Sequence, residues 1–278
     1  MRNIWLVYER NNIARNQFFI DRWYDAARVR GVGIKLIAED EIVCGIKENK
    51  PSILHQDGLV LPDAAVMRLN MPILTAHMEK MGIPCFNNEK VARICNDKRL
   101  THQAVSGIAP MMDTAFLHGH EEKPPFPYPF IVKGAHGCGG RQVFLVQDQE
   151  SFRLALETIQ PDNALAQPVC DTPGKDVRVY VLGNRIIKVM MRFSLSDFRS
   201  NINQGGSSVP YELAADDLKM VYKIMSLFDF GLVGIDFIFH QGRLLFNEIE
   251  DAVGTRMLYA NSIDIVSDYL DLILVRLG

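Results

Sequence analysis

The sequence predicts an α/β layer with a parallel sheet in the first third of the chain and α+β architecture in the rest. Up to about residue 90, apolar strand patterns alternate with helical patterns, which is typical of strand–helix–strand units. Beyond the proline-rich segment 123–129, the strand patterns come instead as hairpins with helices between them. A dinucleotide-binding fold is excluded, because no glycine fingerprint follows the first strand and the first glycine is Gly31.

The first third is expected to alternate between strands and helices. The apolar run 4–8 is the first strand, and the pattern over 16–30 has the length of a helix. The other expected elements are strands at 34–38, 58–61, 65–69 and 84–86 and a helix at 72–81.

The rest of the chain is expected to begin with a helix over 98–105, for which Asn96 is the candidate N-cap. A polar loop at 198–210 interrupts this part, and loops of that length in compact domains are often functional. A final helix over 263–276 has one apolar stripe, which indicates core packing, and Ser262 as its candidate N-cap. The other expected strands lie at 130–133, 143–147, 164–168, 176–182 and 185–192, and the other helices at 149–159 and 216–228.

Composition limits the class of protein. A chain of 278 residues can form two packed domains, and 48% hydrophobic with 23% charged residues is ordinary for a soluble globular protein. The net charge of -3 gives no global attraction to nucleic acid or to an anionic membrane. No run of apolar residues is long enough for a spanning helix. The cysteines are scattered without a Cys-x-x-Cys pair, which favours reduced thiols and a cytoplasmic location.

Three carboxylates interrupt the apolar pattern of the segment 234–250, which reads as a hairpin. A three-residue loop would pair His240 with Leu244, and therefore Asp236 with Glu248, while Glu250 lies two residues further along the same face. Like charges that face each other are destabilising, so the cluster needs a counter-charge, and a divalent cation with oxygen ligands would supply it. A solvated hairpin face is the alternative. A two-residue loop would place Asp236 and Glu248 on opposite faces.

A glycine-rich loop follows the apolar strand that ends in Lys133. It contains four glycines in seven residues, among them Gly137, Gly139 and Gly140. Glycines let backbone N–H groups approach phosphate oxygens closely, and an adjacent lysine adds a point charge. The segment lacks the Gly-Lys-Ser/Thr pattern of nucleotide triphosphatases. A hairpin tip with a solvated lysine is the alternative interpretation.

Two further polar segments stand out in the second half. Strand alternation places Asp176, Arg178 and Tyr180 on one face, with the segment 185–192 returning as a hairpin partner. The segment 198–207 carries an arginine, amides and glycines that could bind phosphate or carboxylate oxygens. Taken alone, it could equally be a surface loop without a ligand.

Together and in this order, these segments resemble the ATP-grasp superfamily and, within it, the RimK-type carboxylate–amine ligases. The resemblance covers the chain well from about residue 91 onward and the first 90 residues only in outline. The matching motifs are Asn96-Asp97-Lys98, the strand Ile131-Val132-Lys133 with its glycine loop, Asp176-Val177-Arg178, Phe198-Arg199-Ser200-Asn201 with Gly205-Gly206, and Gly234-Ile235-Asp236 followed by Glu248.

The resemblance implies an ATP-grasp fold in which two α+β subdomains enclose ATP. Residues 1–90 would form an N-terminal α/β domain of the pre-ATP-grasp kind. Residues 91–170 would form the small subdomain with a linker helix, and residues 171–278 the C-terminal subdomain with the metal site.

The resemblance also implies which residues bind the nucleotide. Lys98 and Lys133 would contact its phosphates, with Gly137, Gly139 and Gly140 beside them, and Asp176 would contact the ribose. Backbone groups around Pro168 and Val169 would meet the adenine, and Arg199, Ser200 and Asn201 would lie near the triphosphate.

The metal site and the catalytic cations follow from the same resemblance. Asp236, Glu248 and Glu250 would hold Mg²⁺, with Mn²⁺ as an alternative, and Arg192 and Arg199 would stabilise the transferred phosphoryl charge. The chain departs from the family at Glu250, where asparagine is usual, which puts metal preference in doubt. It departs again at Pro168, where an acidic residue is common, and the proline has no N–H to donate.

The implied activity is ATP-dependent ligation of a carboxylate to an amine through an acyl phosphate, with release of ADP and phosphate. The partners would be ATP, a small-molecule or peptide carboxylate, and an amine or amino-acid acceptor, without nucleic acid or membrane; a homo-oligomer stays open. One alternative is an ATP-grasp kinase that phosphorylates a small molecule. Another is a catalytically silent ATP-binding module.

Overall fold

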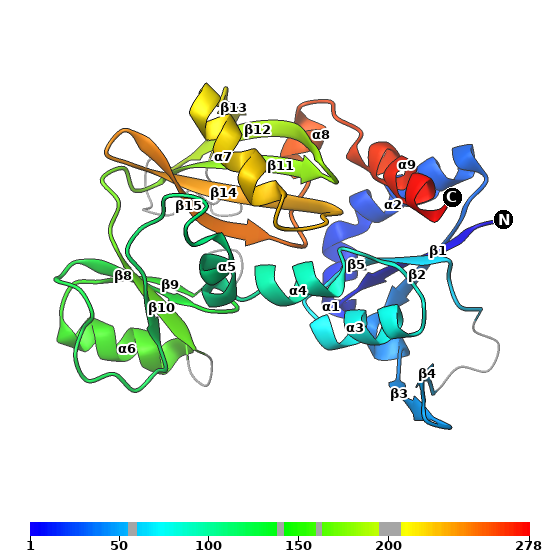
Figure 1. Cartoon of the computed structure of the whole chain (residues 1–278), viewed down its shortest axis with the longest axis horizontal. Helices are drawn as coiled ribbons and strands as arrows, with labels where there is room; N and C mark the ends of the chain where they lie inside the picture. The colour runs from blue at the N-terminus through cyan, green and yellow to red at the C-terminus, as the bar shows by residue number, and fades with distance from the viewer. Residues whose placement is uncertain (55–59, 138–141, 160–162, 195–206) are drawn as a thin grey trace.

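The computed structural model describes residues 1–54, 60–137, 142–159, 163–194 and 207–278 (Figure 1). Within these residues the chain forms three main sheets and one small hairpin. The N-terminal sheet is parallel and the other two are antiparallel, so the predicted mixture of α/β and α+β architecture is confirmed. Predicted elements that reach into 138–141 or 195–206 lie partly outside the described residues.

The N-terminal sheet has the order β2-β1-β5-β6. Its central strand, β1, is buried from Ile4 to Tyr8, as a strand of a parallel sheet covered on both faces should be. A hairpin of β3 and β4, which the apolar pattern did not predict, projects from this region. Residues 60 and 61 of the predicted strand 58–61 are not in a strand. The elements are β1 (Asn3–Tyr8), α1 (Arg10–Ile13), α2 (Gln17–Arg30), β2 (Gly33–Ala38), β3 (Cys44–Lys47), β4 (Lys50–Ile53), β5 (Ala64–Arg68), α3 (Pro72–Lys80) and β6 (Cys85–Phe86).

The middle sheet has the order β7-β10-β8-β9, and helix α6 packs against it. Its core is self-contained: Phe130 and Val132 of β8 pack with Phe152 and Leu156 of α6. The elements are β7 (Ala115–Leu117), β8 (Phe130–Gly134), β9 (Val143–Val146), α6 (Gln149–Ile159) and β10 (Ala164–Pro168).

The C-terminal sheet has the order β13-β12-β11-β14-β15. One face packs against α7, α4 and α5 through residues such as Val177, Val179 and Phe237. The opposite face, here called the site face, carries Asp176, Arg178 and Tyr180 of β11, as strand alternation predicted. The elements are α4 (Glu89–Cys95), α5 (Lys98–Val105), β11 (Lys175–Leu182), β12 (Arg185–Phe193), β13 (Ser207–Pro210), α7 (Ala215–Met225), β14 (Leu232–His240) and β15 (Arg243–Glu250).

The two ends of the chain meet in one hydrophobic core. Leu6 of β1 and Trp23 of α2 belong to the same buried cluster as Tyr180 of β11 and Tyr269 of α9. Helices α8 (Arg256–Ala260) and α9 (Ile265–Leu277) close this core, and Figure 1 shows α9 beside α2. The guanidinium of Arg2 donates to the carbonyls of residues 277 and 278 at 3.0 Å. The N-terminal and C-terminal sheets are thus packed against each other. The middle sheet lies on the far side of the C-terminal sheet from the N-terminal sheet (Figure 1).

Both predicted N-caps are wrong by one or two residues. Asp97, not Asn96, caps α5 by accepting from the N–H of residue 99 at 2.9 Å. Asn96 instead donates to Asp251 at 2.9 Å. For α9 the cap is Asp264, and Ser262 has a positive φ of 58° in the preceding turn. In each case a carboxylate one or two residues after the predicted cap accepts from a backbone N–H of the first turn.

Candidate active site

The hairpin of β14 and β15 brings the three carboxylates together, but by a different route from the one predicted. The loop has two residues, Gln241 and Gly242, with φ of 51° and 71°, so His240 pairs with residue 243. Positive φ at both loop positions is the hairpin turn that matches strand twist. The predicted three-residue loop is therefore wrong, and a regular ladder from this turn would have separated the acids.

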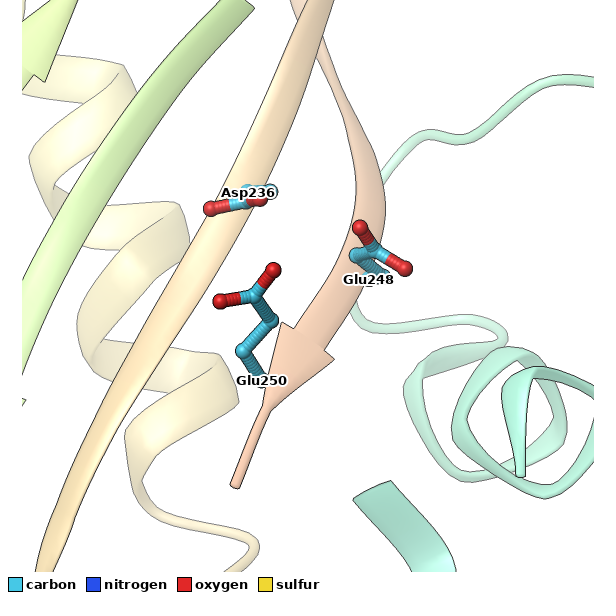
Figure 2. A group of neighbouring side chains, drawn as sticks. All are labelled: Asp236, Glu248 and Glu250. Atoms are coloured by element: carbon cyan, nitrogen blue, oxygen red, sulfur yellow. The ribbon is translucent and has the colours of Figure 1, made fainter. Parts of the chain in front are cut away.

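A β-bulge restores the pairing. Phe237 pairs with Phe246, whereas Asp236 pairs with Glu248, so Asn247 is the extra residue on β15. The bulge shifts the register by one residue just before the acids. Asp236, Glu248 and Glu250 then lie with ligand oxygens within 4.8 Å of one another, as Figure 2 shows on the facing strands. The predicted cluster is confirmed as a geometric arrangement.

Two buried arginines supply much of the counter-charge that the sequence led us to expect from a cation. Arg178 holds Asp236 with two hydrogen bonds of 2.7 and 2.6 Å and also reaches Glu250 at 2.8 Å. Arg192 binds Asp236 at 2.7 Å and holds Asp176 with two bonds of 2.6 Å. Both arginines are 5% exposed, and such planar, two-pronged pairs are the strong kind.

Gly234 makes room for this network. A Cβ at that position would lie 2.7 Å from the side chain of Val253 and 3.3 Å from that of Arg178. The glycine pairs with Glu250 across the hairpin, so its missing side chain leaves the space that the guanidinium needs.

Burial and the neighbouring charges shift the pKa values of the three acids in different directions. Burial opposes ionisation of Asp236, but Arg178 and Arg192 outweigh it and lower the pKa of Asp236 to about 2. Glu248 is half-buried, which opposes its ionisation, but the charge of Lys98 outweighs this and lowers the pKa of Glu248 below the usual value. Burial, with a smaller contribution from the neighbouring acids, raises the pKa of Glu250. Burial rather than repulsion between the acids is the main cause of the raised pKa of Glu250.

Two lysines from elements outside the hairpin, Lys133 of β8 and Lys98 of α5, contact residues of β15. Lys133 at the end of β8 donates to the Asn247 amide oxygen at 2.8 Å, so the bulge residue meets the middle sheet. Lys98 lies 3.2 Å from Glu248 and donates to the backbone carbonyl of Gly137. Burial lowers the pKa of Lys133 to about 8, although Glu248 acts in the opposite direction. Both predicted lysines thus converge on the carboxylate hairpin.

His102, which the sequence analysis did not single out, is hydrogen-bonded to the backbone of Lys98. His102 bonds through Nδ1 to the Lys98 carbonyl at 2.7 Å, and its Nε2 accepts from Gln167 at 3.0 Å. Burial lowers the pKa of His102 to about 4, so the ring is uncharged at neutral pH. The only sequence signal is its position one helical turn after Lys98, which is common in cores.

Not every predicted site residue can be located. Gly139, Gly140, Arg199, Ser200 and Asn201 lie outside the described residues. Pro168 ends β10 and Val169 follows it, both half-buried. The sequence-based site also omitted Arg178 and Asn247. Arg178 could have been found from its place on the same strand face as Asp176, and Asn247 only from the bulge.

The donor set fits a hard divalent cation. Three carboxylates with oxygens this close offer the ligands that Mg²⁺ accepts when phosphates or waters complete its shell. The site has equal numbers of acidic and basic side chains. The four acids are Asp176, Asp236, Glu248 and Glu250, and the four bases are Lys98, Lys133, Arg178 and Arg192. A cation without an accompanying anion would therefore add uncompensated charge.

The sequence and the fold both match known proteins. Residues 111–273 match the RimK-like ATP-grasp domain, and the chain belongs to that family. Mouse N-acetylaspartylglutamate synthase A is 29% identical over 228 residues, which are 74% of this chain and 60% of the mouse protein. The chain thus spans less than two thirds of that relative's length.

Two solved structures share the fold over nearly the whole chain. A RimK domain ATP-grasp protein from Sphaerobacter thermophilus superposes with a TM-score of 0.74 at 17% identity, covering 98% of this chain and 99% of that one. The D-alanine–D-alanine ligase of Bacillus anthracis, solved with ATP, gives 0.73 at 15% identity, covering 99% and 96%. The predicted fold and family are confirmed. Separately, none of the helices in the described ranges has the length and apolar character of a bilayer span.

Proposed function

We propose that the protein is an ATP-dependent carboxylate–amine ligase that forms an amide or peptide bond and releases ADP and phosphate. The observation that carries the proposal is the meeting of Asp236, Glu248 and Glu250 with Lys98 and Lys133 in a chain of the RimK-like family. Acids that can hold a metal and lysines that can hold phosphates are the two halves of a phosphoryl-transfer site.

In this proposal, ATP lies between the middle sheet and the C-terminal sheet. Lys98 and Lys133 exchange their present partners, the carbonyl of Gly137 and Asn247, for phosphate oxygens. Asp176 contacts the ribose, with its second role as the partner of Arg192. The loop residues Gly139, Gly140, Arg199, Ser200 and Asn201, and the backbone at Pro168 and Val169, complete the nucleotide site by resemblance to the family.

The chemistry makes a poor electrophile reactive. An oxygen of the substrate carboxylate attacks the γ-phosphorus, the new O–P bond forms, and the bond to the β-phosphate oxygen breaks to release ADP. The amine nitrogen then attacks the acyl carbon, phosphate leaves with the C–O bond, and the amine loses a proton. Arg192, and Arg199 by resemblance, stabilise charge on the transferred group. Mg²⁺ held by the three acids would add charge neutralisation, and Mn²⁺ could take the same oxygen ligands.

The proposal is tested by the dependence of ADP release on substrates. Pools of amino acids and small carboxylates, supplied with ATP and Mg²⁺, should release ADP only when a carboxylate and an amine are both present. Hydroxylamine should replace the amine and give a hydroxamate, because it traps an acyl phosphate. ADP release that needs an alcohol and no amine would identify a kinase instead, and nucleotide binding without turnover in any pool would identify a silent module.

Lys133→Ala is expected to weaken ATP binding by roughly 1.5–3 kcal/mol with little change in folding, because a charge-assisted phosphate contact is lost. In the unaltered protein, affinity should fall by up to about tenfold per pH unit above pH 8. The reason is that the free lysine has a pKa of about 8 and bound phosphate would raise it, so binding above pH 8 requires proton uptake. Lys133→Arg stays charged and should remove this pH dependence. Calorimetric titration of nucleotide measures both effects; unchanged affinity in folded Lys133→Ala would exclude the phosphate role.

A further inference from the structure

A cavity of about 300 Å³ lies on the site face of the C-terminal sheet, away from the lysines. Its lining comes from three places that are distant in sequence. Arg178 and Arg192 come from strands β11 and β12, Phe19 from α2, and Met257 from α8. The cavity therefore exists only because the N-terminal region packs against the C-terminal sheet. Its size suits a small metabolite rather than a peptide, since ligand pockets run from roughly 300 to 1,000 Å³.

Arginine side chains are prominent in the lining of the cavity. Four arginines line it, Arg15, Arg178, Arg192 and Arg256, and none of the described residues in its lining is an aspartate or a glutamate. Arg178 and Arg192 are held by carboxylates outside the lining. Arg15 and Arg256 are exposed, so they stand where the cavity meets solvent. Arg15 makes no ion pair with any described carboxylate. A ligand of this cavity should therefore be anionic, with charge at the Arg15 side.

Apolar side chains form another part of the lining. Phe18 and Tyr259 meet edge to face with ring centroids 5.0 Å apart, and Phe19 and Met257 are buried residues of the same lining. The side chains of Phe18, Phe19 and Met257 offer no strong hydrogen-bond partners, so this part of the lining suits a short hydrocarbon body.

The deep end of the cavity adjoins the carboxylate cluster. Arg178 lines the cavity, and the same side chain is 2.6 Å from Asp236 and 2.8 Å from Glu250. A substrate carboxylate in contact with Arg178 or Arg192 would thus be separated only by that arginine side chain from Asp236, which is proposed to hold the metal.

We propose that this cavity binds the carboxylate substrate of the ligase, and that this substrate is a small dicarboxylate. One carboxylate faces Arg178 and Arg192 and is the one activated, the hydrocarbon body lies along Phe19 and Met257, and Arg15 and Arg256 hold the second carboxylate. The inference rests on the proposed function for the reaction but on the cavity alone for the binding.

The probes are succinate, glutarate, L-aspartate and L-glutamate, each compared with its monoamide, such as succinamate or L-glutamine. Dicarboxylates should bind to the ATP-free protein in calorimetric titrations and should support hydroxamate formation, and the monoamides should do so at least tenfold less well. Arg15→Gln and Arg256→Gln should each raise the KM for the dicarboxylate about tenfold, with kcat and the KM for ATP little changed. Arg15→Lys should restore part of the affinity.

Arg28→Gln is the matched control, because Arg28 is an exposed arginine of α2, the helix that begins two residues after Arg15, and it does not line the cavity. If Arg15→Gln, Arg256→Gln and Arg28→Gln give the same dicarboxylate KM, or if the monoamides serve as well as the diacids, the assignment is overturned. Dicarboxylate binding that is lost in Arg15→Gln, without turnover in any mixture, would support the cavity and reject the ligase. Turnover with monocarboxylates alone would support the ligase and reject the cavity.

Discussion

Glu248→Gln is expected to lower the rate of ADP release by roughly 10²–10³-fold while the hairpin stays folded. The substitution keeps the shape of the side chain but removes the negative charge that faces Lys98 at 3.2 Å and that is proposed to hold the metal. Glu248 is also the acid that the Asn247 bulge brings opposite Asp236. Initial rates at several Mg²⁺ concentrations, with the urea midpoint of each variant as a check of folding, measure the effect.

Glu250→Asn is the comparison variant. It places the family's usual residue at a position where burial already raises the pKa of the acid, so it should keep substantial activity. Because the cluster is balanced by Arg178, Arg192 and the lysines, Mg²⁺ should bind weakly to the free protein and tightly only with ATP. Full activity of Glu248→Gln at every Mg²⁺ concentration would end the claim that this hairpin is the metal site.

Asp236→Ala is expected to destabilise the fold by roughly 3–5 kcal/mol, because it leaves Arg178 and Arg192 buried without their shared partner. Asp236 is completely buried and accepts three hydrogen bonds from these arginines. Urea unfolding of the purified variants gives the free energy of unfolding. Asp268→Ala is the control, since its pair with Arg185 is 3.9 Å long and about half exposed, and it should change stability by less than about 1 kcal/mol.

The contribution of Asp236 also has a defined pH range. The two arginines lower its pKa to about 2 in the folded protein, below the usual 3.8. Stability from this ionised form is therefore complete above about pH 4 and is lost as the pH falls toward 2. The difference in stability between the unaltered protein and Asp236→Asn should shrink over the same range. Equal losses for Asp236→Ala and Asp268→Ala would show that the buried network contributes nothing.

Much of the fold followed from the spacing of apolar residues. Strands such as 176–182 and helices such as 149–159 were predicted within a residue, because each buries one regular face. The elements that were missed are short or exposed. The β3–β4 hairpin is one, since its strands have four residues each and are partly exposed. Periodicity carries little signal in segments of that length.

The candidate site was predicted in part because two irregularities cancel. In the carboxylate hairpin, a two-residue loop and a bulge at Asn247 together give the pairing that a three-residue loop would give. The β11–β12 hairpin has the same feature: its register shifts next to Tyr180, which brings Asp176 opposite Arg192. Bulges depend on twist and on contacts from other elements, so the residue pattern alone does not reveal them.

The pairing of the arginines with particular acids was the other part that could not be foreseen. A carboxylate cluster in sequence indicates only that positive charge is needed, and either a metal or arginines satisfy that need. Arg178 was on the predicted face, but its pairing with both Asp236 and Glu250 depends on the order of β11, β14 and β15 in the sheet. Strand order is a long-range property that one sequence does not state.

The shared core of the two chain ends has a consequence for synthesis on the ribosome. Leu6 and Trp23 are translated long before Tyr269 and Ile273, which share their core. The N-terminal sheet must therefore wait, with apolar surface exposed, until Tyr269 and Ile273 have been translated. The middle sheet completes its own core within residues 115–168 and can fold while translation continues. The nascent chain is thus expected to acquire structure first in its middle and last at its beginning.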